Sequence, residues 1–230
     1  MPAHLALALA AAALLNLDRL ALGQNALGRP LLTGTAVGLI LGLPLEGLTL
    51  GLWTEVLWLD RPPLGGAIIP NGALAVASAL AGLCLASGGP DLPAPGTILV
   101  PAMTLVPPLA RLANLVEPAT RLWSQGAHKD LEERLESDRP LGLLRLNFLA
   151  VLLTWLAGLA LAAAGSLLAY MGLRLFAGLS PDSLLAVLAS GPRATLACFL
   201  FAALGLPKKR LAGFAVGACA LCLAARLLSG

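Results

Sequence analysis

Charged residues are scarce in this sequence. They make up 12% of its 230 residues, whereas soluble domains carry roughly 25%. Apolar residues make up 58%, and the mean hydropathy is +0.87. A soluble protein of this size cannot cover so much apolar surface with so few charges, and a disordered chain needs low hydrophobicity and high net charge. The composition therefore predicts an all-α polytopic membrane protein within the lipid bilayer.

Other residue types are also too rare for several classes of protein. Four cysteines are too few for a secreted disulfide scaffold. The two histidines, His4 and His128, lie near the start of the chain and in a hydrophilic loop, so we expect no metal site and no cofactor. A net charge of +3 without a basic stripe argues against nucleic-acid binding. No GxSxG motif, phosphate-binding glycine loop or plausible Ser/His/Asp set is present, so we do not expect an enzyme.

The uncharged runs indicate where the chain crosses the bilayer. A charged group in hydrocarbon is costly, so each long uncharged run is a candidate crossing. Together with the first apolar run, Ala3–Leu15, these runs predict about seven membrane segments. The long uncharged runs span residues 62–90, 92–110, 146–173, 194–207 and 211–225.

A hydrophilic stretch divides the chain into three parts. We expect an N-terminal membrane region over residues 1–116, a cytoplasmic loop over 117–140 and C-terminal membrane helices over 141–230. The loop and a second basic turn at 207–210 are assigned to the cytoplasm because Lys and Arg concentrate on that side. The turn at 88–96 has no Lys or Arg and is expected on the outside.

Two apolar runs of the N-terminal half are interrupted. In the run 30–59, Pro44 and Gly47 flank Glu46, which favours a break over one rod of about 45 Å. The run 64–88 contains Ile69-Pro70-Asn71-Gly72 in its first half. Membrane transporters build sites from broken or re-entrant helices of this kind, because the freed backbone groups line a cavity.

Two later runs also predict interruptions. Pro101, Pro107 and Pro108 are expected to kink or split the run 98–116. The run 141–177 is too long for one straight crossing, unless it breaks near Gly165 or tilts steeply.

Glycines recur at a spacing of four residues in the first broken run. On a helix this spacing forms a smooth surface. Close packing of two helices is the preferred interpretation, and a surface along which helices slide is the alternative. The glycines concerned are Gly34, Gly38 and Gly42, followed by Gly47 and Gly51.

The ionisable residues inside apolar runs are the strongest functional signal. Glu55 lies in LWTEVLWL, where its carboxylate must face a partner or a wet cavity. One interpretation is a structural ion pair with Arg29 or Arg61. The other is a sugar site, because carboxylates, amides and indoles bind hydroxyls and the apolar face of a sugar ring. The residues suited to such a site are Glu55, Trp53, Trp58, Gln24, Asn25 and Asn71.

The stretch over residues 17–80 carries a family pattern. An Asp ends the first apolar run, Arg-Pro opens the second, and Gly-x-x-x-Gly, a Glu in an apolar run and Gly-Ala-x-Ile-Pro follow. This order resembles the membrane IIC subunit of the mannose/sorbose-type phosphoenolpyruvate-dependent phosphotransferase system (PTS). The matching positions are Asp18, Arg29-Pro30, Gly38, Gly42, Glu55-Val56 and Gly65–Pro70.

The resemblance implies function and partners. It implies a sugar-translocating subunit of the bacterial inner membrane, in an oligomer with a IID membrane subunit. Cytoplasmic IIA and IIB subunits would carry the phosphoryl group to the sugar. Two acidic positions of the family pattern differ here, where Leu43 and Asn71 stand instead, so the sugar and the transport activity are open.

These observations give a specific prediction for the site. We expect Glu55 and Asn71 to line a sugar cavity, with Gln24 and Asn25 as further candidates. Asp18 and Arg29 are expected to hold the broken helices in register. One alternative is a degenerate membrane scaffold that assembles with or regulates a partner without transporting. Another is a small-solute transporter outside this system, which needs a proton or ion relay.

Overall fold

The structure is a computed structural model. It describes residues 2–20, 26–58, 70–87, 95, 96, 98–115, 117, 118, 120, 122, 123, 125, 126 and 143–179. Every named element among these residues is a helix, which confirms the all-α class. The candidates Gln24 and Asn25, the turn at 207–210 and the membrane segments expected beyond residue 180 lie outside the described residues.

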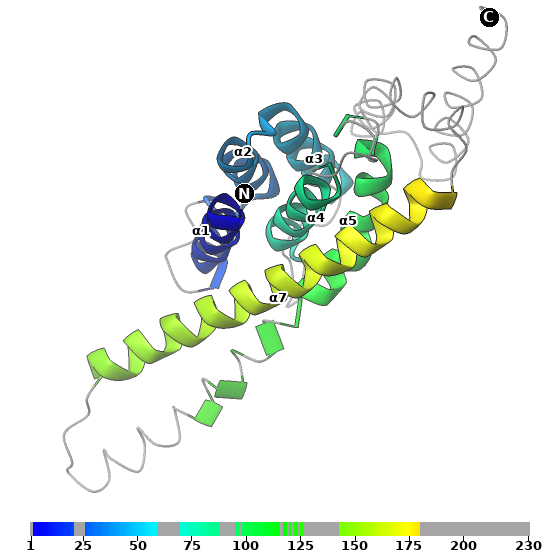
Figure 1. The fold of residues 1–230 in the computed structure, drawn as a ribbon. Helices are drawn as coiled ribbons and strands as arrows, with labels where there is room; N and C mark the ends of the chain where they lie inside the picture. Colours follow the sequence, from blue (N-terminus) through cyan, green and yellow to red (C-terminus); the bar gives the residue numbers. More distant parts are fainter. Residues whose placement is uncertain are drawn as a thin grey trace, which may run out of the picture.

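The first five helices form a bundle that packs against a much longer helix (Figure 1). α4 is at its centre: it contacts every other named helix, and all residues from Gly72 to Leu83 are buried. A helix buried on all sides must be apolar all round, and small residues let its neighbours approach closely. The helices are α1 (Pro2–Leu20), α2 (Pro30–Leu41), α3 (Pro44–Leu57), α4 (Gly72–Ser87), α5 (Leu99–Ala113) and α7 (Leu143–Leu179).

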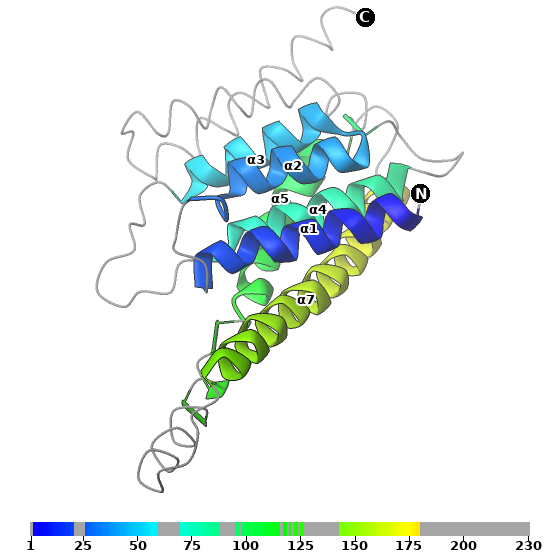
Figure 2. The same ribbon diagram turned by 90° about the vertical axis from the view of Figure 1, so that its left-hand side faces the viewer.

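The predicted break in the run 30–59 is confirmed. α2 ends at Leu41, and Gly42 follows with φ 75°, a left-handed conformation that favours glycine. Pro44 then opens α3, where its missing backbone N–H costs nothing. The chain reverses at this point, so α2 and α3 lie side by side as an antiparallel hairpin (Figure 2).

Glycines bring the two backbones of the hairpin into contact. A Cβ at Gly34 would lie 2.5 Å from the carbonyl oxygen of Gly47, and one at Gly51 would lie 2.9 Å from Cα of Leu31. The glycine spacing in this hairpin therefore serves close packing. With 12 and 14 residues, the two helices are about 18 and 21 Å long. The end of α3 therefore lies beside the beginning of α2.

The two later runs are not divided at the expected positions: α5 is not split at Pro107 and Pro108, and α7 does not break near Gly165, which leaves a tilted helix as the alternative. α5 continues through Pro107 and Pro108, because the adjacent Val106 and Leu109 are buried in the core and hold the helix together. α7 continues through Gly165 for 37 residues. A Cβ at Gly165 would lie 2.6 Å from Oγ of Ser78, so this glycine admits a neighbouring helix and does not break its own.

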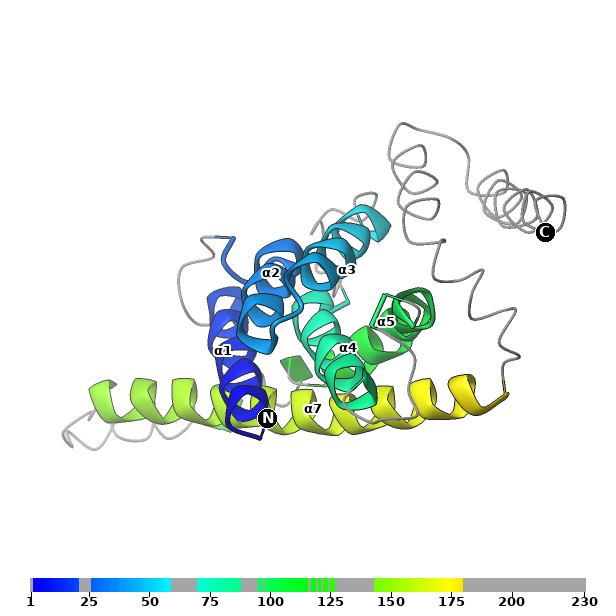
Figure 3. The same cartoon turned by 45° about the horizontal axis from the view of Figure 1, so that its top comes forward.

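A line of small residues on α7 faces the bundle. Gly158 faces Ala13 and Asn16 of α1, and Gly172 faces Leu105 of α5. Figure 3 shows α1 to α5 on the same side of α7, which crosses them obliquely. Among the described helices, only α7 is long and apolar enough to cross a membrane, over Arg145–Gly178. The residues of this line, the α7 seam, are Gly158, Ala162, Gly165, Ala169 and Gly172.

Candidate functional site

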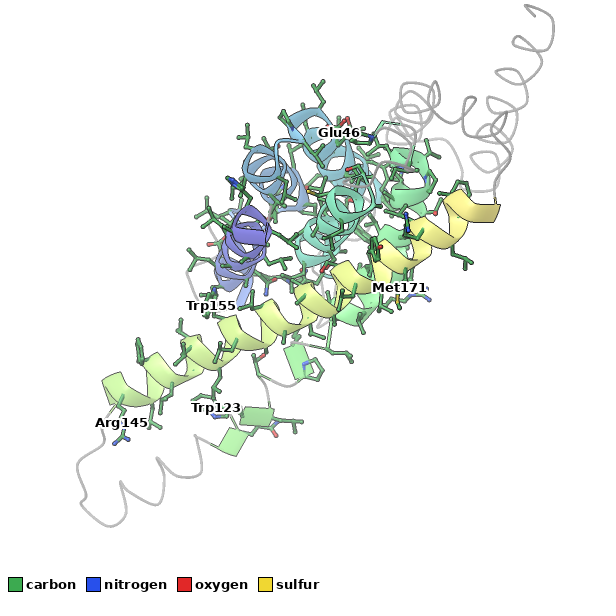
Figure 4. The ribbon with its side chains drawn as sticks, in the orientation of Figure 1. Glu46, Trp123, Arg145, Trp155 and Met171 are labelled. Carbon is green, nitrogen blue, oxygen red and sulfur yellow. The ribbon has the colours of Figure 1, made fainter. Side chains whose placement is uncertain are left out.

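The polar residues of the bundle gather at one end because the helices alternate in direction. The C-termini of α1, α3 and α5 meet the N-termini of α2 and α4 there. Glu46, the other carboxylate of the hairpin, lies in the first turn of α3, so it is at the opposite end of the hairpin (Figure 4). We call this end the polar end; its side chains are Asn16, Asp18, Arg19, Arg29, Glu55, Asn71, Asn114 and Glu117.

Glu55 forms the ion pair that the sequence left as an alternative. Its Oε1 lies 3.1 Å from Nη1 of Arg29. The Glu55 side chain is 23% exposed and that of Arg29 is 65% exposed. The second oxygen, Oε2, is buried and has no hydrogen-bond partner among the described residues. The carboxylate therefore carries one satisfied and one unsatisfied oxygen at the open end of the hairpin.

The two tryptophans near Glu55 occupy different environments. Trp53 belongs to the hydrophobic core and is 6% exposed. Trp58 follows Glu55 by three residues, a spacing that places both on one side of a helix. Its ring lies 3.0 Å from the position of a Cβ at Gly72. Of the two indoles, Trp58 is therefore the one on the side of the carboxylate, next to the start of α4.

Asn71 joins three helices at the start of α4. Its Nδ2 donates to Oδ1 of Asn16 at 2.8 Å, and its backbone N–H donates to Oδ1 of Asn114 at 2.7 Å. Its own Oδ1 accepts the N–H of Leu74 at 3.2 Å, an N-cap for α4. The side chain is buried, so in this conformation Asn71 connects α1, α4 and α5. Its role as a sugar ligand stays a prediction.

Asp18 and Arg19 attach the end of α1 to neighbouring segments. Oδ2 of Asp18 accepts the N–H of Gly28 at 3.3 Å, which fixes the approach to α2. Nη1 of Arg19 donates to the carbonyl of Pro70 at 3.4 Å, and Nη2 lies 3.8 Å from Oε2 of Glu117. The expectation that Asp18 and Arg29 hold the broken helices in register stays a prediction; in the structure Asp18 and Arg19 make the contacts at the end of α1.

Sequence reasoning missed four members of the polar end: Asn16, Arg19, Asn114 and Glu117. Asn16 is fully buried, and its Nδ2 has no partner among the described residues. It precedes Arg19 by three residues, and Asn114 precedes Glu117 by the same spacing. Residues three positions apart lie on the same face of a helix. An amide three positions before a charged residue was therefore the sequence signal that could have indicated these positions.

Replacing Asn71 with leucine is expected to lower the free energy of unfolding by about 2–4 kcal/mol. The change removes the N-cap of α4 and leaves Oδ1 of Asn16 buried without a donor. Thermal unfolding of the detergent-solubilised protein measures this. Asn147→Leu on the exposed part of α7 is the matched control and should unfold like the unchanged protein. Equal melting of both variants would show that the Asn71 contacts do not stabilise the bundle.

Asn71→Asp should be the milder change. An aspartate keeps the cap but cannot donate to Asn16. The Nδ2 of Asn16, which has no partner in the described ranges, can supply that donor if the Asn16 amide turns over. We therefore expect Asn71→Asp to retain more stability than Asn71→Leu.

Comparison with known proteins identifies the chain. No curated protein matches it. The PTS system sorbose-specific IIC component family matches residues 3–191, a range that includes the whole polar end. This match confirms the resemblance seen in the sequence. The chain therefore belongs to the sorbose-specific IIC component family, the membrane subunits of mannose-type sugar phosphotransferase systems.

Proposed function

We propose that this chain moves a hexose-like sugar across the bacterial inner membrane as the multi-pass IIC subunit of a mannose-type PTS. The sugar passes to a cytoplasmic IIB subunit for phosphorylation, and IIA supplies the phosphoryl group. A IID membrane subunit completes the translocating oligomer. Family membership supports the sugar-transport role. The single observation that carries the site is the Glu55 carboxylate at the open end of a helical hairpin, one oxygen of which is buried and has no hydrogen-bond partner within the described part of the chain.

In this proposal Glu55 accepts sugar hydroxyls and Trp58 faces the apolar side of the ring. A carboxylate binds hydroxyls more strongly than a neutral acceptor does, and a half-buried position reduces competition from water. Asn71 lies at the neighbouring break and is the second proposed residue of the cavity, with Gln24 and Asn25. One hydrogen of the Asn71 amide group remains for the sugar, because Nδ2 donates its other hydrogen to Asn16 and Oδ1 accepts from Leu74.

The scaffold alternative has its own support in the same contacts. Glu55 already pairs with Arg29, and the Asn71 amide already joins α1 to α4. Leu43 packs as a partly buried hydrophobic residue against the core, at the position where the family pattern has an acid. These contacts are sufficient for a scaffold, because a chain that only assembles with a partner needs a stable fold and no sugar site.

Uptake of radiolabelled mannose and sorbose tests the proposal. We expect a strain lacking this gene to lose uptake of one of the two sugars and to regain it with the full-length chain. Uptake should also require the phosphoryl donor proteins, because this system traps the sugar as its phosphate. Sugar uptake that is independent of the phosphoryl donor favours a transporter of another kind. Unchanged uptake of both sugars in the deletion strain favours the scaffold.

A further inference from the structure

The two members of the Arg29–Glu55 pair differ in how firmly they are held. The backbone of Arg29 is fixed, since its N–H donates to Ala26 and its carbonyl accepts from Thr33 at the start of α2. Its side chain is 65% exposed, and the hydrogen bond and ion pair that it forms among the described residues are with Glu55. Glu55 is 23% exposed and follows the fully buried Thr54 on α3. The guanidinium can therefore move away into water, whereas the carboxylate stays with its helix.

The contact between them blocks the carboxylate as a sugar ligand. A carboxylate can bind two adjacent sugar hydroxyls with its two oxygens, one hydroxyl to each. In the structure Oε1 accepts a hydrogen bond from Arg29, and Oε2 is buried and has no donor among the residues that the structure describes. A sugar can reach both oxygens only after the carboxylate turns, and the Arg29 contact opposes that rotation.

We propose that Arg29 is a latch on the sugar site: it holds Glu55 in a closed orientation and must leave when the sugar binds. This inference rests on the proposed function, with Glu55 as the sugar ligand. Arg29 is then a positioning residue that competes with the substrate for one oxygen. The apparent affinity for sugar is reduced by the fraction of molecules in which the latch is closed.

Ionic strength gives a test that a purely structural pair does not pass. The sugar is neutral, so salt does not screen its own attraction to the site. Salt does weaken an ion pair with an exposed member. Sugar affinity should therefore rise with salt in the unchanged protein, and the increase should disappear when Arg29 is removed.

The experiment measures binding of radiolabelled mannose and sorbose to membrane vesicles that contain the full-length chain and its partner subunits, without phosphoryl donor. For the sugar that binds, Arg29→Gln is expected to tighten binding about two- to fivefold at low salt. The strength of an exposed ion pair implies that the paired form is about two- to fivefold more populated than the unpaired form, and removing Arg29 makes all molecules competent to bind. Its affinity should not change between low and high salt. Arg29→Lys should keep the salt response of the unchanged protein.

Arg111→Gln is the matched control. Arg111 is exposed in the last turn of α5, so this variant removes the same charge and should bind and respond to salt like the unchanged protein. An affinity of the unchanged protein that does not vary with salt overturns the latch and leaves the proposed function standing. So does an Arg29→Gln variant with unchanged or weaker binding. Absence of binding for both sugars at every salt concentration overturns the proposed function itself.

Discussion

Replacing Gly47 with leucine is expected to prevent the hairpin of α2 and α3 from closing. A Cβ at Gly47 would overlap the carbonyl oxygen of Gly34 and lie 2.9 Å from Cα of Gly38. Both neighbours are backbone atoms, so no rotamer change relieves the clash, and both helices lose their place against α4. We expect a loss of more than about 3 kcal/mol in the free energy of unfolding.

The yield of folded, monodisperse protein in detergent measures this effect. Gly178→Leu is the matched control, because a Cβ at this α7 glycine has no neighbour within 4 Å among the described residues. Gly47→Ala should give an intermediate yield. If Gly47→Leu accumulates as well as Gly178→Leu, the two backbones do not touch as described.

Replacing Glu55 with glutamine is expected to lower sugar affinity about ten- to a hundredfold. The amide keeps the shape of the side chain but exchanges a charged acceptor for a neutral one, a difference of roughly 1.5–3 kcal/mol per hydrogen bond. Titration of the full-length chain with the transported sugar measures the affinity. Glu46→Gln at the opposite end of the hairpin is the control and should bind normally.

Stability separates the ligand role of Glu55 from a structural one. Removing one partner of a fully buried ion pair costs about 3–5 kcal/mol, because the other charge is left in low dielectric. Here the remaining partner is Arg29, whose side chain is 65% exposed and stays hydrated. We therefore expect Glu55→Gln to change the free energy of unfolding by less than about 1 kcal/mol. A stability loss of several kcal/mol, or unchanged sugar affinity, would assign Glu55 a structural role.

The sequence predicted interruptions correctly where they depend on local chemistry. Gly42 and Pro44 end one helix and start the next through backbone preferences that any chain obeys. The same reasoning does not decide whether a helix continues through Pro107 or Gly165, where it does so because of tertiary packing. α5 tolerates its prolines because adjacent side chains are buried, and Gly165 is small because Ser78 lies against it.

The sequence indicated that Glu55 needs a partner but not which one. An ionisable residue in an apolar run needs a partner, so the sequence left Arg29 and Arg61 as alternatives, and the structure pairs Glu55 with Arg29. A single Asn in an apolar helix carries no such requirement, since it can also bond to its own backbone. The contacts of Asn71 with Asn16 and Asn114 depend on how helix ends meet in space, and sequence spacing does not contain that information.

The unbroken α7 links the orientation of the bundle to the thickness of the bilayer. Arg145 and Arg174 both lie on this helix, about 44 Å apart along its axis, whereas the hydrocarbon core is about 30 Å thick. The stretch between the two arginines is therefore longer than the hydrocarbon core, a mismatch that a crossing helix reduces by tilting, and lipids with longer acyl chains bring such a helix more upright. Because the α7 seam packs against α1, α4 and α5, such a change rotates the bundle and the Arg29–Glu55 pair with it. Acyl-chain length is therefore a variable that sets how this protein sits relative to the membrane surface.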